Sequence, residues 1–180
     1  MIDTSNISGQ SVRNTILFIT LVLLQVLVCN NILLFGVGVP MPFIYFLILM
    51  PLGMSLNILL VLAFLLGFTV DLFSDTLGLN CVACLLLAVL KKPVFYAYMP
   101  REDKNADLTP TLFTMGWENY IKFLISLSLI YCLLVFFIEF TSFAAFGRIL
   151  AMAIVSAILS MLIMLGIDTL VSSSLRKSDR

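Results

Sequence analysis

Long apolar stretches separated by short polar turns make up most of this sequence. The first fourteen or so residues are polar, and six apolar stretches follow. We expect each stretch to form a helix, with approximate bounds 15–35, 40–55, 57–74, 78–98, 119–140 and 148–171. A helix needs about 20 predominantly apolar residues to cross a bilayer. The pattern therefore predicts an all-α integral membrane protein, a six-transmembrane-helix bundle in which residues 1–180 form a single transmembrane domain.

The composition agrees with this pattern. The chain has 180 residues, of which 62% are hydrophobic and 11% charged, whereas an average soluble domain is about 25% charged. The formal net charge is zero, so no overall field favours nucleic acid as a partner. The chain has no histidine, the commonest metal ligand. Its CxxC, Cys81 to Cys84, lies in an apolar stretch and is interpreted as a pair of buried small hydrophobic residues. We expect no metal and no cofactor.

Local signals mark several boundaries of the expected helices. Pro51 should kink or stop the second helix near its far end. Asn57 is a plausible N-cap for the third. The fourth stretch meets Lys91 and Lys92 before its end, and we expect their ammonium groups to snorkel to the membrane interface. Because Pro93 follows directly, a re-entrant segment remains an alternative to a full fourth span.

The basic residues indicate how the helices are oriented. With the N-terminus in the cytoplasm, nine of the ten basic residues fall on the cytoplasmic side, and Arg148 is the exception. This distribution is what the positive-inside rule expects. A five-span layout would place the charged loop at about 99–118 and the basic C-terminal segment on opposite sides. We therefore expect six spans, both termini in the cytoplasm and a location in the cytoplasmic membrane.

The stretch from 63 to 80 holds the candidate functional positions. Ala63, Gly67 and Asp71 recur every four residues and so share one helix face. Small residues let another helix approach closely, and an ionisable group at membrane depth normally faces protein or water. Gly78 lies in the polar turn that follows. We expect a helix–turn–helix here, and we take Ala63, Gly67, Asp71 and Gly78 as candidate positions for contact with a partner protein.

Catalytic chemistry is not indicated. Asp71 and Asp75 are one possible metal pair, but they have no histidine or basic neighbour, which membrane enzymes acting on lipid phosphates usually need. We interpret Asp71 as a structural hydrogen-bond acceptor or a partner contact rather than a catalytic acid. The residues thus favour a scaffold or assembly subunit, with a transporter module as the second hypothesis and a lipid-modifying enzyme as the third.

Three short motifs carry a resemblance to a known family. They are YFLILMP at 45–51, GFTVDL at 67–72 and LGL at 77–79, followed by an apolar helix. This pattern resembles the bacterial rod shape-determining membrane protein MreD. The resemblance covers most of the chain in layout and residues 43–90 in motif, while region 99–119 is longer than the corresponding loop. Gly67, Asp71 and Gly78 are the motif positions carried over.

The resemblance implies a non-catalytic membrane scaffold of the cell-wall elongation complex, which maintains cell shape. Members of this family associate with the bitopic protein MreC, and through it with MreB filaments, the glycosyltransferase RodA and a class B penicillin-binding protein. Their bundle is similar to the substrate-binding subunits of energy-coupling-factor transporters. That similarity supplies the alternative, a substrate-binding subunit of a vitamin transporter. No catalytic residue is implied.

Overall fold

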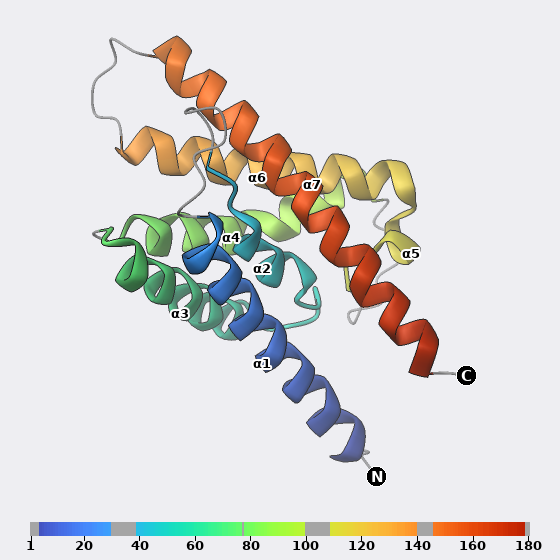
Figure 1. Ribbon diagram of the computed structural model, residues 1–180. Coiled ribbons are helices and arrows are strands. Elements are labelled where there is room, and N and C mark those ends of the chain that lie inside the picture. The colour runs from blue at the N-terminus through green and yellow to red at the C-terminus, as the bar shows by residue number, and fades with distance from the viewer. Residues whose placement is uncertain (1–3, 30–38, 77, 100–108, 140–145, 179–180) are drawn as a thin grey trace.

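The computed structural model describes residues 4–29, 39–76, 78–99, 109–139 and 146–178 (Figure 1). Every regular element in these ranges is a helix. The elements are α1 (Thr4–Leu27), the 3₁₀ helix η2 (Pro42–Ile44), α2 (Tyr45–Leu49), α3 (Leu56–Ser74), α4 (Leu79–Tyr98), α5 (Leu112–Met115), α6 (Trp117–Glu139) and α7 (Phe146–Ser178). Among them, α3, α4, α6 and residues 150–169 of α7 are long and apolar enough to cross a membrane. The expected all-α membrane protein is confirmed at this level.

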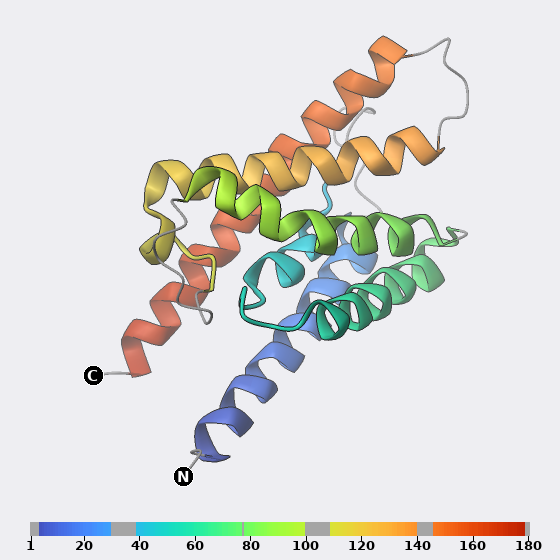
Figure 2. The same ribbon diagram turned by 180° about the vertical axis from the view of Figure 1, so that it is seen from behind.

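Three of the long helices lie side by side. Helix α4 packs between α3 and α6, and the three alternate in direction (Figures 1 and 2). Helix α7 crosses α6 obliquely on one side, and α1 packs against α3. The beginning of α1, the end of α7 and α5 all lie at one end of the bundle, on the right in Figure 1. The ends of α3 and α6 lie at the opposite end.

The second expected helix, over about 40–55, is wrong in length. Helical backbone covers only Pro42–Ile44 and Tyr45–Leu49, and Met50 is already extended with ψ 139°. Eight helical residues span about 12 Å, well short of the 30 Å or so of a bilayer core. The segment is enclosed by the other helices, since residues 43–48 are at most 3% exposed. Pro51 is where the sequence predicted a stop, and Met50 ends the helix one residue earlier.

Side chains of neighbouring helices satisfy the extended backbone that precedes this short helix. The amide of Val39 donates to Ser156 Oγ over 3.1 Å, and that of Met41 donates to Ser160 Oγ over 2.7 Å. The carbonyl of Pro40 accepts from Gln25 Nε2 at 3.3 Å. Non-helical backbone is tolerated at membrane depth only where protein or water forms hydrogen bonds with its polar groups. Here side chains of α1 and α7 form these hydrogen bonds.

The lysine expected to snorkel is instead part of the core. Lys91 is 2% exposed, and its ammonium donates to the carbonyls of Leu47 (2.9 Å) and Met50 at the end of α2. A cation is favourable there because carbonyls at a helix C-terminus lack partners and carry partial negative charge. Lys92, which is half-buried, reaches the carbonyl of Met54 at 3.4 Å. Helix α4 continues through Pro93 to Tyr98 and runs the length of the bundle, so the re-entrant alternative is not what the structure shows.

The remaining helix bounds are close to those expected. Helices α3, α4 and α6 begin and end within two residues of the predicted bounds. Helix α7 is longer at both ends than the predicted 148–171. Helix α1 begins earlier and ends at Leu27, and residues 30–35 of the predicted first helix lie outside the described residues.

Candidate functional site

The carboxylate of Asp71 lies at the joint between α3 and α4. It is 4% exposed, and its Oδ1 accepts from the backbone amide of Asn80 (3.0 Å) and from Asn80 Nδ2 (2.9 Å). Its Oδ2 accepts from the amide of Cys81 at 2.8 Å, and the Thr76 hydroxyl also donates to Oδ1. Both amides belong to the first turn of α4, where N–H groups have no partner within the helix. Asp71 therefore caps α4 from another helix, and its charge complements the positive end of the α4 dipole.

The same joint is tied to α6. The hydroxyl of Tyr131, which is fully buried, donates to Asn80 Oδ1 over 2.7 Å. Asn80 Nδ2 also approaches the Thr76 hydroxyl at 3.3 Å. Asp71, Thr76, Asn80 and Tyr131 thus form one buried hydrogen-bond network that joins three helices. Such networks fix a unique arrangement when every member is satisfied.

The small residues on α3 face α4 of the same chain. A Cβ on Gly67 would lie 2.5 Å from Cys81 Cα and 2.8 Å from the carbonyl oxygen of Asn80, so only glycine fits. Ala63 is fully buried. Gly78 is the N-cap of α4 with φ +77°, a left-handed conformation that glycine adopts without strain.

These contacts bear on the interpretation of the small-residue face. The helix–turn–helix is present, and Asp71 is a structural hydrogen-bond acceptor, as one of the two sequence interpretations held. Gly67 and Asp71 lie against the start of α4, and Ala63 is fully buried, so in this structure these residues pack within the chain. Gly78 serves the turn itself. A partner of this chain would have to use other faces.

A second buried acid lies toward the other end of the bundle. Asp168 on α7 is 6% exposed, and its Oδ1 accepts from the hydroxyl of Tyr45 on α2 over 2.5 Å. The bond holds the short helix against α7. It complements the bonds from Ser160 and Ser156, which lie about two and three turns earlier on α7.

The cysteines agree with their interpretation as buried small hydrophobic residues. Cys29, Cys81, Cys84 and Cys132 are buried and free of disulfides. Within the described ranges, no three His, Cys, Asp or Glu side chains come together as a metal site would require.

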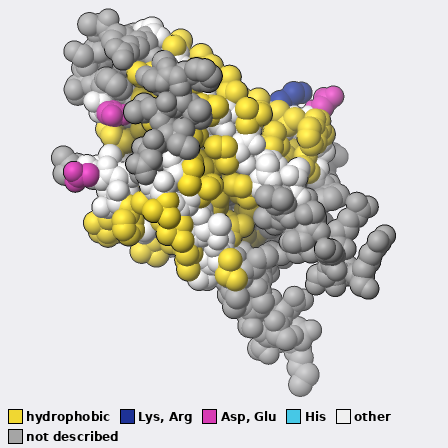
Figure 3. Space-filling view, viewed as in Figure 1, with side chains coloured by type: hydrophobic (Ala, Val, Ile, Leu, Met, Phe, Trp, Pro, Cys, Tyr) yellow, Lys and Arg dark blue, Asp and Glu magenta, His cyan; other side chains and the backbone are white. Residues whose placement is uncertain are grey.

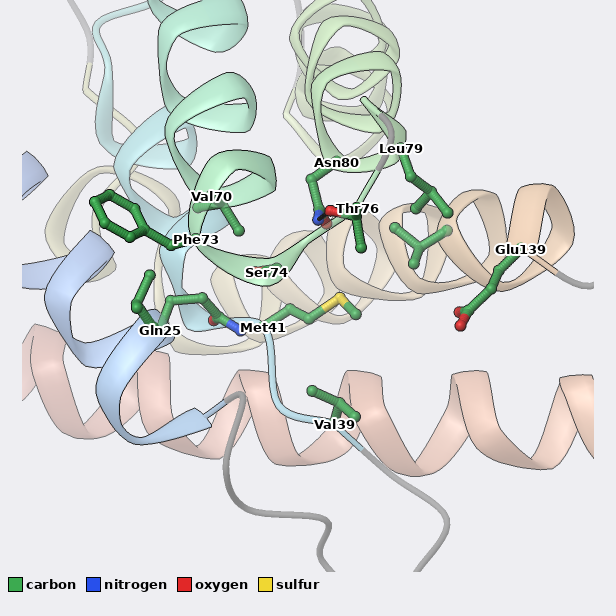
Figure 4. A pocket seen from close by; sticks show the side chains of 12 residues that line it. Gln25, Val39, Met41, Val70, Phe73, Ser74, Thr76, Leu79, Asn80 and Glu139 are labelled. Carbon is green, nitrogen blue, oxygen red and sulfur yellow. Dashed lines mark hydrogen bonds between the residues drawn. The ribbon is translucent and has the colours of Figure 1, made fainter.

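A cavity of about 460 Å³ opens at the end of the bundle where α3 and α6 terminate (Figure 4). Residues from α1, α3, α4 and α6, from the α3–α4 turn and from the extended 39–41 segment line it: Gln25, Val26, Val39, Met41, Val70, Phe73, Ser74, Thr76, Leu79, Asn80, Val135 and Glu139. Its volume lies within the usual range for small-molecule sites, roughly 300–1,000 Å³. The sequence analysis did not predict this cavity, because its wall comes from segments up to 114 positions apart, Gln25 to Glu139.

Comparison of the chain with protein-family models, curated proteins and solved structures gives no match. The case for a function therefore depends on the sequence motifs and on the geometry described above.

Proposed function

We propose that this chain is a non-catalytic membrane scaffold of the bacterial cell-wall elongation complex, acting in cell shape maintenance through association with an MreC-like membrane protein. The supporting observation is the use of the buried ionisable groups. Asp71 binds the first turn of α4, Lys91 the last carbonyls of α2, and Asp168 the hydroxyl of Tyr45. Each of these three groups holds one helix of this chain to another, which is the role expected of buried charged residues in a non-catalytic scaffold.

The motif that resembles MreD supports the same proposal. Its positions Gly67, Asp71 and Gly78 meet at one joint, where each has a distinct physical role: close approach, helix capping and a left-handed turn. Because all three roles are structural, the motif indicates a fold rather than a reaction. Its presence here favours descent from a family that shares this framework.

The proposal extends to membrane topology. We place the chain in the cytoplasmic membrane with six passes and both termini cytoplasmic, in a bundle resembling the substrate-binding subunits of energy-coupling-factor transporters. The second pass is then residues 39–55, half extended and half helical. The described lysines support the orientation, because Lys92 lies near the end of α4 and Lys122 near the start of α6. Both helix ends lie at the side of the bundle where α1 begins and α7 ends (Figure 1).

A partner would use the outward faces, since the small-residue face is covered. One such face on α3 exposes large apolar side chains, among them Val61, Phe64, Leu65, Phe68 and Leu72. The rings of Phe64 and Phe68 stack with their centroids 5.8 Å apart, one turn from each other. This face meets lipid or a transmembrane helix, and both suit its composition.

The test is purification of the tagged chain from its native membrane in mild detergent. We expect an MreC-like bitopic protein to co-purify directly, with RodA-like glycosyltransferase, class B penicillin-binding protein and MreB-like filaments recovered only when that partner is present. Depletion of the chain should convert rods to spheres. Absence of the MreC-like protein from the purified material, together with unchanged cell shape, would overturn the proposal.

A second candidate function is a substrate-binding subunit of a vitamin transporter of the energy-coupling-factor type. The cavity of about 460 Å³ is the observation that favours it. Under this alternative, the chain co-purifies with an ATPase-driven coupling subunit, and its deletion abolishes uptake of one vitamin. Co-purification with wall-synthesis proteins in place of a coupling subunit distinguishes the two.

A further inference from the structure

Apolar and polar side chains share the wall of the cavity at the α3–α6 end. Seven of its twelve lining residues are apolar, namely Val26, Val39, Met41, Val70, Phe73, Leu79 and Val135. Its volume of about 460 Å³ lies within the range of roughly 300–1,000 Å³ of small-molecule sites. Its size and mixed wall fit a small organic molecule, or an alkyl chain, that joins an apolar body to a polar or charged group.

Most of the polar side chains on the wall are already engaged within the protein. Asn80 donates to Asp71 and accepts from Tyr131, and the Thr76 hydroxyl donates to Asp71. Gln25 donates to the carbonyl of Pro40. These hydrogen bonds hold the bundle together.

Glu139 differs from them. It is exposed, it lines the cavity, and it is the last residue of α6 (Figure 4). A carboxylate at a helix C-terminus faces the negative end of the helix dipole, so helix stability does not account for it there. Among the described residues, the cavity wall contains no Lys or Arg, and the only ion pair is Glu118 with Lys122 at the opposite end.

We propose that this cavity binds an organic cation with an apolar body, whose ammonium group pairs with Glu139 while the body packs against the apolar lining residues. This assignment goes beyond the scaffold function and does not depend on it. The cation can come from two sources, an amine-headed lipid or a soluble aromatic amine. Both share the same chemistry, and the experiment separates them.

The experiment uses the full chain in nanodiscs of phosphatidylcholine. A dodecylammonium probe with a diazirine on its chain is photo-crosslinked, and the modified residues are mapped by mass spectrometry. We expect crosslinks to concentrate on the lining residues of α3, α4 and α6. Unlabelled dodecylammonium should compete roughly three- to fivefold better than dodecanol, the range expected for a partly exposed ion pair, and dodecanoate should compete worst.

Matched variants connect this preference to the carboxylate. Glu139→Gln should remove the preference for the ammonium over the alcohol, while Glu118→Gln, the same change at the far end of α6, should leave it intact. Leu79→Phe fills the cavity from the start of α4 and should reduce crosslinking with every head group. Crosslinks spread evenly over the lipid-facing helices, or an ammonium preference that survives Glu139→Gln, would overturn the proposal.

Competition by tryptamine distinguishes the sources. Competition by tryptamine as strong as that by the alkyl amine supports a soluble cation as the occupant, and competition by the alkyl amine alone supports a lipid. Recovery of the MreC-like partner should be unchanged in Glu139→Gln. Failure of the cavity proposal is thereby separable from failure of the scaffold proposal.

Discussion

At the residue scale, buried charge in this protein is matched to backbone groups at helix ends. Lys91 meets the carbonyls that end α2, and Asp71 meets the amides that begin α4. The sequence indicated that Asp71 would face protein or water, as a structural hydrogen-bond acceptor or a partner contact, because its position follows a long apolar stretch. It gave the opposite expectation for Lys91. The partner of Lys91 lies 41–44 positions away in a helix whose short length no local pattern revealed.

Lys91→Met tests the first of these pairs. Methionine keeps the apolar stem, but it leaves the Met50 carbonyl buried without the ammonium donor. The Leu47 carbonyl also loses the ammonium and keeps only the amide of Met50 at 3.4 Å. Each unsatisfied buried acceptor costs about 1–3 kcal/mol, partly offset because a buried ammonium no longer has to be desolvated. We expect a net loss of about 1–3 kcal/mol, measured as a lower thermal midpoint in detergent. The neighbouring change Lys92→Met should lower the thermal midpoint far less, because Lys92 is only half-buried. Equal effects of the two would contradict the capping role.

Asp71→Asn tests the second pair. The amide of asparagine has one acceptor oxygen where the carboxylate has two, so the amides of Asn80 and Cys81 cannot both keep their bonds. Loss of an N-cap costs about 0.5–2 kcal/mol, and loss of the anion at the dipole adds to it. Asp75→Asn is the control, because Asp75 is exposed and asparagine tolerates its left-handed φ of 54°. Asp71→Asn should unfold at a clearly lower temperature than Asp75→Asn. An Asp71→Asn protein as stable as the unchanged chain would contradict the capping role of Asp71.

At the element scale, the α3–α4 joint is a close helix contact that depends on Gly67. Gly67→Ala places a methyl group 2.5 Å from Cys81 Cα, so the two helices must separate. We expect a lower thermal midpoint or loss of folded protein. Gly166→Ala is the matched control, since a Cβ there meets nothing within 4 Å and alanine favours helix by about 0.5–1 kcal/mol. Gly166→Ala should be neutral or stabilising, and a similar loss in both variants would rule out the close contact as the cause.

The elements also show where reasoning from the sequence succeeds. Helices α3, α4 and α6 were predicted to within two residues, because each has about 20 apolar residues bounded by polar turns. The second helix was not, because the bonds from Ser156 and Ser160 that stabilise extended backbone at 39–41 come from 117 and 119 positions later. The small-residue face was recognised correctly, but periodicity alone does not say whether the neighbouring helix belongs to the same chain. The cavity likewise depends on how distant segments meet.

At the scale of the whole molecule, charge is divided between the two ends of the bundle. Figure 3 shows described acidic side chains at the left edge, and lysine with a further acid at the right. Glu139 ends α6 at the cavity end, while Lys122 and Glu118 lie in its first turns at the other end. In the proposed topology, the positive-inside rule puts the lysine end in the cytoplasm, and the cavity then opens to the outer face of the membrane.

This orientation can be measured with single cysteines in intact spheroplasts. The four native cysteines are buried, so a membrane-impermeant maleimide should react mainly with an added surface thiol. Glu139→Cys should be labelled without permeabilisation, whereas Glu118→Cys, near the other end of the same helix, should be labelled only after it. Both side chains are exposed, so a difference in labelling reports the side of the membrane rather than burial. The reverse pattern would place the cavity in the cytoplasm and invert the proposed topology, while the same pattern for both residues would mean that α6 does not cross the membrane.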